Sequence, residues 1–400
     1  MKIVYFSPHP NIYLNIPAGP GVHIREMIRG FEQEGHEVTP LIMGGVDAQE
    51  SSGGGTQTKG LKERIKPLIP NILWQSLKDR QLFAFDDHAS AELKALCEKV
   101  KPDLIYERAY YGMTSGVRVA KELGIRHVLE MNAPYPEERV DMEGRSMGTS
   151  KAKKAEKQQL KDTDRVVVVS SALKEYVNNV VPGTEAKTII TPNAIRSDFE
   201  APHQSHIDKT KQELGLEGKT VVGFVGSIFP YHGVDQLIEA FAETCAKQDD
   251  KALLVVGDGA ILDGLKTLAD SLGIGEQVRF TGKIPHAKVF AHIGAMDICV
   301  MATSNWYGSP VKIFEYGAMG KTVIAPDVSP VTDVMENDKH GLLVQPNTPN
   351  IASALAKCIN DQITASTMAE QWKTKVLTEH RWQAMAAKVL NSLNGNDIQV

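Results

Sequence analysis

The stretch "SPVKIFEYGAMGKTVIAP", residues 309–326, combines the signals of a helix and a strand. Ser309 is a good N-cap, Pro310 suits the first helical position, and Gly320 suits the residue that follows the helix end. The apolar run 322–325 predicts a short buried strand. The stretch is therefore interpreted as a helix that begins at a loop and packs against a sheet.

Lys312 lies in the first turn of this helix, where a cation opposes the helix macrodipole. The free backbone N–H groups at a helix N-terminus form an anion site, and a phosphate bound there would make Lys312 a ligand. The alternative is an ordinary surface lysine that pairs with Glu315, three residues further along the helix. This stretch alone leaves both interpretations open.

The chain has 400 residues, 42% hydrophobic and 23% charged, which is enough for two globular domains. Its formal net charge of -5 implies no general affinity for nucleic acid. The four cysteines form neither a CxxC pair nor a zinc spacing, so a reducing, cytoplasmic compartment is expected. We find no apolar signal segment and no run of roughly 18 apolar residues, so any membrane contact would be peripheral.

Short apolar runs alternate with helical patterns in both halves of the chain, which predicts parallel sheets with helical crossovers. A polar stretch at 197–217 separates the halves. We expect a first domain at 1–198, to which a C-terminal helix within 378–400 returns, and a second domain at 199–377. Candidate strands lie at 2–6, 35–43, 101–108, 125–132, 164–171, 186–194, 220–227, 251–259, 277–284, 296–302, 322–325 and 341–346.

Ligands of open α/β sheets bind at the carboxyl ends of the strands, and two loops expected there contain glycine and histidine. The loop 17–27 contains Gly21 and His23, and the loop 226–235 contains His232. Each loop is a weak phosphate signal by itself. The dinucleotide fingerprint is absent because residues 19–24 read "GPGVHI", and no Walker A, HExxH or GxSxG motif occurs.

Blocks in both halves resemble those of the retaining glycosyltransferases of family 4, which have the GT-B fold. The resemblance covers essentially the whole chain, and the order and spacing of the blocks are more specific than any single one. It is strongest over 219–346. The matching blocks are "IYERAYYG", "VLEMNAP", "VVVVS", "TPNAI", "VVGFVGS", "HGVDQLIEAF", "LLVVGDG", "VRFTGKI", "MDICVMA", "SPVKIFEYGAMGKTVIAP" and "HGLLV".

The resemblance implies an α/β chain of two Rossmann-like, doubly wound domains that face each other across a cleft. The C-terminal helix would pack back on the N-terminal domain. The family transfers a sugar from a nucleotide-diphosphate donor, here UDP- or GDP-linked, to an acceptor with retention of configuration. The donor lies mainly on the second domain and the acceptor on the first. No cofactor, metal ion or side-chain nucleophile is expected, since the leaving phosphate oxygen takes the acceptor proton.

Carried over by position, Glu315 matches the second glutamate of the family's E-x7-E motif, which hydrogen-bonds the donor ribose. The main chain of Ile284 would read the base, and Gly21 would let the first-domain loop reach the diphosphate. The first glutamate of the motif is replaced by Tyr307. The complete set of donor-binding candidates is Gly21, Ser227, His232, Ile284, Tyr307, Ser309, Val311, Lys312 and Glu315.

The family's arginine and lysine phosphate pair falls on Ser227 and His232, and its N-terminal histidine falls on Asn132. We expect Lys312, a protonated His232 and Arg108 to replace the missing cations. Asn132 and Tyr307 would orient the transferred sugar. The catalytic candidates are thus Lys312, Glu315 and Asn132, and the residues that orient acceptor or sugar are His23, Arg108, Glu130 and Asn132.

The acceptor domain contains two basic stretches, 59–81 and 150–161, of which the first also has an apolar stripe. Such a stretch can lie on an anionic membrane, but a solvated helix face with a core-facing stripe is an equal alternative. A glycan or a lipid-linked saccharide at the inner membrane face is therefore a plausible acceptor, in surface polysaccharide or glycoconjugate synthesis. Two other functions stay open: a GT-B nucleotide-sugar epimerase, and a non-catalytic sugar-nucleotide-binding partner of another transferase.

Overall fold

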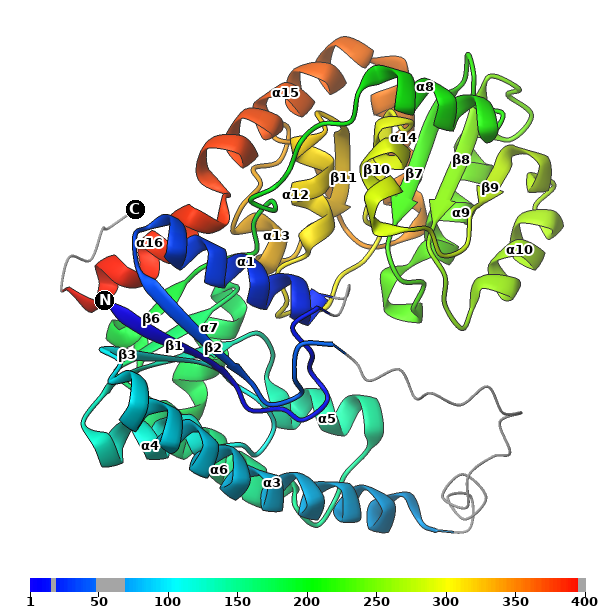
Figure 1. The fold of residues 1–400 in the computed structure, drawn as a ribbon. Coiled ribbons are helices and arrows are strands. Elements are labelled where there is room, and N and C mark those ends of the chain that lie inside the picture. Colours follow the sequence, from blue (N-terminus) through cyan, green and yellow to red (C-terminus); the bar gives the residue numbers. More distant parts are fainter. Residues whose placement is uncertain (16–18, 48–68, 395–400) are drawn as a thin grey trace. The chain divides into compact units, whose positions relative to one another are not determined.

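In the computed structural model, residues 1–15, 19–47 and 69–394 are described. The chain forms two compact units, each built around a six-stranded parallel sheet (Figure 1). Unit 1 comprises Met1–Thr191 and Gln383–Val400, and unit 2 comprises Pro192–Trp382. These limits differ by a few residues from the domain boundaries expected at 198 and 378.

The sheet of unit 1 has the order β2-β1-β3-β4-β5-β6, and every pairing is parallel. Its strands fall within the runs predicted from the sequence, except that the first extends to Ser7. They are β1 (Lys2–Ser7), β2 (Glu37–Ile42), β3 (Leu104–Arg108), β4 (Arg126–Met131), β5 (Arg165–Val168) and β6 (Thr188–Ile190). The helices are α1 (Gly19–Gln33), α3 (Asn71–Val100), α4 (Ser115–Leu123), α5 (Tyr135–Glu143), α6 (Thr149–Asp162), α7 (Ser171–Val180) and α16 (Trp382–Leu393).

Helices cover both faces of this sheet. On one face, Leu93 of α3 and Val119 of α4 pack into a cluster with Val4 and Ile105 of the strands. On the other face, Phe31 of α1 meets the ring of Tyr106 edge-on, with the ring centroids 5.1 Å apart. A sheet covered on both faces explains why its strands read as nearly continuous apolar runs.

The sheet of unit 2 has the order β12-β11-β10-β7-β8-β9 and is also parallel throughout. Its strands are β7 (Thr220–Val225), β8 (Lys251–Val256), β9 (Val278–Phe280), β10 (Ile298–Val300), β11 (Thr322–Pro326) and β12 (Leu342–Val344). The helices are α8 (Gln204–Glu213), α9 (Val234–Cys245), α10 (Leu262–Ser271), α11 (Val289–Gly294), α12 (Val311–Ala318), α13 (Ser329–Thr332), α14 (Thr348–Asn360) and α15 (Gln362–Glu379). Helices α9, α10 and α14 share one core cluster, and α11, α12 and α15 share the other. The expected pair of doubly wound α/β domains is therefore confirmed.

Two stretches contain helices that the sequence predicts only in part or not at all. Helix α8 lies within the stretch 197–217, which was interpreted only as a boundary. Helix α3 begins at Asn71, directly after Pro70, and extends for 30 residues. The basic stretch 59–81 is therefore not one continuous element, and its residues 59–68 lie outside the described residues. Within the described residues, no helix combines the length and apolar character that crossing a membrane requires.

Candidate functional site

The strand order of unit 2 creates a topological switch point. The chain runs from β7 outward to β8 and β9, then returns to β10 on the other side of β7 and continues to β11 and β12. The loops after β7 and β10, residues 226–233 and 301–310, therefore leave neighbouring strands and lead to helices on opposite faces. Open α/β sheets bind ligands at such points.

Helix α12 is fixed at the end of β7. The Val225 N–H donates to the Tyr316 hydroxyl over 2.9 Å, and the Trp372 indole N–H of α15 donates to the Ile313 carbonyl over 2.9 Å. The second contact depends on Gly317, because a Cβ there would lie 2.5 Å from the indole nitrogen. The first turn of α12 is thereby held at the switch point.

Lys312 extends from this first turn over the ring of Phe224 in β7, with Nζ 4.2 Å from the ring centroid. The side chain as a whole is half-buried, but Nζ is shielded from solvent and has no hydrogen-bond partner among the described residues. Gly226, at φ 148°, leaves room for it, because a Cβ there would lie 3.1 Å from Nζ. The alternative of a surface lysine paired with Glu315 is therefore wrong.

Burial sets the electrostatics of this helix. It lowers the pKa of Lys312 to about 7, although the Glu315 carboxyl acts in the opposite direction. It raises the pKa of Glu315 to about 7, although Arg196 and Lys312 favour the ionised carboxylate. A buried ammonium without a hydrogen-bond acceptor destabilises the free protein. An anion with several oxygen acceptors would satisfy it.

Arg196 is the residue at this site that the sequence analysis missed. It acts electrostatically on Glu315, its Nη1 donates to Nδ1 of His286 over 2.7 Å, and its Nε pairs with Asp198 over 2.9 Å. An isolated arginine just before the polar stretch 197–217 belongs to no motif that could have revealed it. Ile284, the predicted base-reading residue, lies two residues before His286 and is half-buried.

His232 lies in the loop after β7 and contacts the backbone. Its Nδ1 donates to the Ser227 carbonyl over 2.5 Å, which leaves Nε2 of the neutral ring as an acceptor. Burial and the Lys312 ammonium lower the pKa of His232 to about 4. The expectation that a protonated His232 supplies a second positive charge is therefore wrong for the free protein. The Ser227 side chain is exposed at the same loop.

The loop after β10 is tied to the linker that opens unit 2. The hydroxyl of Ser309 accepts from the Asn193 N–H over 2.9 Å, and its carbonyl accepts from the Asn193 side-chain amide over 2.6 Å. Ser309 is therefore not the N-cap of α12, which begins at Val311 with Pro310 in the cap position. Tyr307 is buried and packs edge-on against Trp306, with ring centroids 5.2 Å apart.

In unit 1, three predicted residues converge on one oxygen, Oε1 of Glu130. Arg108 lies opposite Glu130 in the register of β3 and β4, and its Nη1 is 2.6 Å from Oε1. His23 Nε2 approaches to 3.0 Å and the Asn132 amide donates over 2.5 Å. Burial opposes the ionisation of Glu130, but His23 and Arg108 hold its pKa at about 2. The carboxylate therefore orients its partners.

This arrangement corrects the role expected for Arg108. Its guanidinium is buried and its charge is matched by Glu130, so it is not a cation available for a diphosphate. Asn132 directly follows the carboxyl end of β4, and His23 contacts Glu130 near the same end. Gly21 lies two residues before His23 on the buried side of α1. In residues 1–15, 19–47 and 69–394, no group of three or more His, Cys, Asp or Glu side chains could hold a metal ion.

Two family models match the chain, one mainly over each unit. The model "Glycosyltransferase Family 4" matches residues 17–199, and the model "Glycosyl transferases group 1" matches residues 206–375. Together they account for both units. The chain belongs to glycosyltransferase family 4. The resemblance inferred from the sequence blocks is thereby confirmed.

Among curated relatives of this chain is a GDP-mannose-dependent alpha-(1-6)-phosphatidylinositol monomannoside mannosyltransferase from Mycobacterium tuberculosis. It is 26% identical over 59% of this chain and 63% of its own length. A D-inositol 3-phosphate glycosyltransferase from Corynebacterium glutamicum is 27% identical over 61% of this chain and 60% of its own. The chain thus spans less than two thirds of the length of these relatives.

Solved structures share the fold over the full chain. Anabaena HepE, crystallised with UDP, superposes with a TM-score of 0.72 at 16% identity and covers 99% of this chain and 100% of its own. Sucrose-phosphate synthase from Thermosynechococcus elongatus superposes with a TM-score of 0.71 at 18% identity, with 98% of each chain covered. The chain therefore has the GT-B fold.

Proposed function

We propose that the protein transfers a sugar from a UDP- or GDP-linked donor to a saccharide or lipid-linked acceptor, with retention of configuration. The donor would bind at the switch point of unit 2 and the acceptor on unit 1. The observation that carries the proposal is the shielded Nζ of Lys312 at the start of α12, which has no hydrogen-bond partner in the described part of the chain. A buried charge without a hydrogen-bond partner is characteristic of a functional site, because it lowers the stability of the free protein.

The chemistry follows from this charge. When the bond between the sugar and the diphosphate breaks, negative charge develops on the leaving phosphate. The Lys312 ammonium and the free N–H groups of the first turn of α12 would stabilise it. Glu315 would accept from the ribose hydroxyls, and Val311 would present its backbone amide. This arrangement requires no metal ion or other cofactor, since Lys312 supplies the charge.

The residues of unit 1 would orient the reacting partners. Glu130 holds His23 and Asn132 in place, so each presents a defined group to a sugar hydroxyl. With Nδ1 committed to the Ser227 carbonyl, His232 could accept a hydrogen bond from a sugar hydroxyl through Nε2. The attacking acceptor hydroxyl would give its proton to the leaving phosphate oxygen, so no side-chain nucleophile takes part.

A lipid-linked acceptor is supported by the curated relatives. The mycobacterial relative is named for a phosphatidylinositol monomannoside acceptor and a GDP-mannose donor. We accordingly propose that this glycosyltransferase works on an acceptor held at a membrane surface, in the synthesis of a surface polysaccharide or glycoconjugate.

The donor can be identified by thermal shift with a panel of UDP-, GDP- and other nucleotide sugars, followed by assays of hydrolysis and transfer. We expect one nucleotide class to raise the melting temperature and its sugar conjugate to be turned over. Stabilisation without any turnover would instead favour the non-catalytic binding partner. No stabilisation by any nucleotide sugar would contradict the proposed function.

Lys312→Met tests the assigned charge. We expect turnover to fall by about 10²-fold or more, the scale for loss of a preorganised charge contact. We expect the melting temperature to stay the same or rise, because methionine packs on Phe224 without a buried charge. Lys321→Met is the matched control, since Lys321 Nζ donates to the Gly294 carbonyl over 2.8 Å. It should lose stability and keep turnover, and the reverse pattern would refute the assignment.

A further inference from the structure

Unit 1 exposes an unusual number of large apolar side chains in one place. They belong to the start of α3 and to the segment around the α5–α6 connection. The relative exposures are 48% for Ile72, 48% for Leu73, 50% for Leu77, 65% for Met142 and 70% for Met147. Single exposed apolar residues need no explanation, but a contiguous group indicates an interaction site.

Hydrogen bonds join the two segments and place the start of α3 beside the α5–α6 connection. The Asn71 side-chain amide donates to the Glu143 carbonyl over 2.7 Å, and the Gln75 amide donates to the same carbonyl over 3.1 Å. Further along, the Met147 N–H donates to the Ser76 hydroxyl over 2.9 Å. We refer to this surface, with the basic residues described next, as the α3–α6 face.

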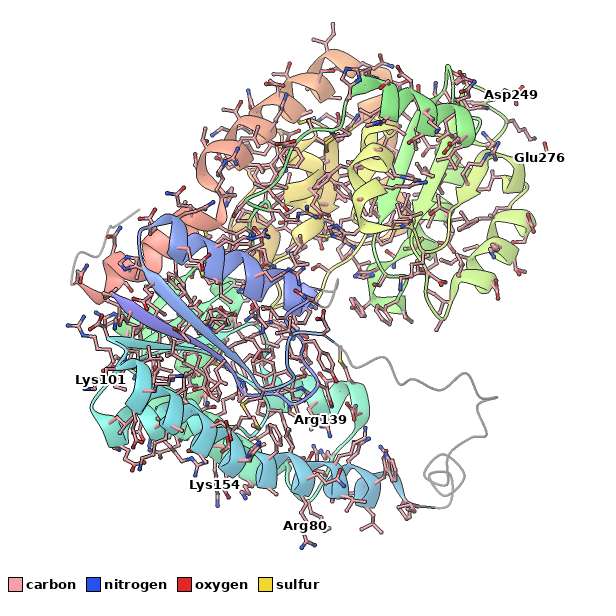
Figure 2. The ribbon with its side chains drawn as sticks, viewed as in Figure 1. Arg80, Lys101, Arg139, Lys154, Asp249 and Glu276 are labelled. Atoms are coloured by element: carbon pink, nitrogen blue, oxygen red, sulfur yellow. The ribbon has the colours of Figure 1, made fainter. Side chains whose placement is uncertain are left out.

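Exposed cations accompany the apolar residues, and none of them forms an ion pair within the described part of the chain. Figure 2 shows Arg80 and Lys154 projecting away from the body of unit 1 on the side of α3 and α6. The unpaired cations are Arg80, Arg145, Lys151, Lys154 and Lys157.

The nearby acidic groups are largely neutralised. Asp79 is buried against Arg139 at 3.1 Å, Asp87 pairs with Arg118 at 3.1 Å, and Glu143 pairs with Lys78 at 2.8 Å. Asp141 is exposed. The α3–α6 face is therefore net positive, although the whole chain carries a formal charge of -5.

A groove of about 490 Å³ opens on this face between α3 and the start of α6. Arg80 and Lys151 lie on its wall, together with the exposed Met147. Lys151 Nζ lies 4.6 Å from the centroid of the Phe83 ring, which also lines the groove. The other lining residues are Ser76, Asp79, Ala84, Asp87 and Gly148.

We propose that the α3–α6 face docks unit 1 on an anionic lipid bilayer, with a lipid headgroup phosphate in the groove between Arg80 and Lys151. Apolar side chains of this kind enter the acyl boundary while the surrounding cations attract anionic headgroups. An anionic bilayer satisfies both parts of the surface, because it offers phosphates to the cations and an acyl boundary to the apolar side chains. The biological purpose of docking rests on the proposed function, because a lipid-linked acceptor lies at a membrane.

Co-sedimentation with vesicles tests the docking independently of catalysis. The full chain is mixed at low salt with vesicles of phosphatidylcholine alone, or of equal parts phosphatidylcholine and phosphatidylglycerol. We expect strong binding only to the second, weakening as salt screens the charges. Equal binding to both vesicles, or none to either, would overturn the proposal. Unchanged nucleotide-sugar binding in the same preparation shows that a negative result does not reflect failure of the proposed function.

Variants locate the surface. Removal of three cations in Arg80→Gln/Lys151→Gln/Lys154→Gln should lower the partition coefficient on the order of a hundredfold. The matched control, Lys209→Gln/Lys266→Gln/Lys288→Gln, removes the same charge from unit 2 and should leave binding nearly unchanged. An equal loss in both triple variants would mean non-specific attraction and would overturn the proposal.

The apolar half of the surface needs a separate variant. Leu77→Gln/Met147→Gln should lower the partition coefficient by roughly tenfold at any salt concentration, because insertion of apolar groups is not screened. Wild-type binding by this variant would refute insertion of the α3–α6 face. Circular dichroism confirms that each variant is folded, and nucleotide-sugar turnover on a soluble acceptor should be unchanged in all of them.

Discussion

At the scale of single residues, burial decides what the candidate site can do. Lys312 and Glu315 are separated by one helical turn, but they do not form the ion pair that their spacing suggests. Lys312 reaches across to Phe224 instead, and burial brings the pKa of both groups to about 7. Arrival of an anionic ligand would raise the pKa of Lys312 and draw a proton to it.

This gives a pH-dependent prediction for donor binding. Affinity for the nucleotide sugar should fall as pH rises above about 7, by up to about tenfold per pH unit, because the ligand binds the protonated lysine. Titration calorimetry in buffers of different ionisation enthalpy should show proton uptake near pH 7.5. Lys312→Met should abolish the slope, and Glu315→Gln should keep it. A flat wild-type profile would contradict the prediction.

At the scale of elements, a buried carboxyl joins α5, α6 and α7. The Tyr176 hydroxyl lies 2.7 Å from Glu156 and 2.5 Å from Glu137. One hydroxyl hydrogen cannot serve two carboxylates, so a protonated Glu156 donating to Tyr176 satisfies the geometry. Burial accordingly raises the pKa of Glu156 to about 8.

Folding stability should therefore depend on this carboxyl. The unfolded chain loses the proton near the ordinary value of 4.5, whereas the folded protein keeps it to about pH 8. Stability consequently falls as pH rises between these values. Glu156→Gln should stabilise the protein at pH 8 by a few kcal/mol, and have little effect near pH 4. Thermal unfolding of the wild type and of Glu156→Gln across this pH range measures the difference in stability. Destabilisation by Glu156→Gln at pH 8 would show that the carboxyl is ionised in the folded state.

At the scale of the whole molecule, the chain consists of two units with separate cores, and α16 closes the first. Met385, Val389 and Leu390 of α16 are buried, and Arg165 of β5 donates to the Ser392 carbonyl over 3.0 Å. The end of the chain is thus part of a core whose strands lie more than two hundred residues earlier.

Amide hydrogen exchange should show that the two units unfold separately. Leu390→Ala should cost about 2–5 kcal/mol and speed amide exchange in β1 and β3–β5, while β7–β11 keep their protection. Leu355→Ala, at a fully buried position of α14, is the matched change in unit 2 and should give the opposite pattern. Loss of protection in both sheets from Leu390→Ala would show that the units unfold together.

Much of the fold could be predicted because its signals are local. Parallel strands covered on both faces appear as continuous apolar runs, so every strand was anticipated. The end of α12 was also predicted, since Gly320 takes φ 63° and the Lys321 N–H returns to the Tyr316 carbonyl over 3.0 Å. Helix α8 was missed because its sequence is polar and lacks a strong apolar stripe.

The sequence by itself determined the two sheets and the family, because strand patterns and motif spacing are written along the chain. Only the tertiary structure decided which ion-pair and hydrogen-bond partners these side chains have. Sheet register brings Arg108 to Glu130, and Asn193 takes the hydroxyl of Ser309 from 116 residues away. Burial, which no linear pattern encodes, leaves the ammonium of Lys312 without an acceptor among the described residues. Hydrogen bonding and desolvation depend on distances in space, and these exist only after the chain has folded.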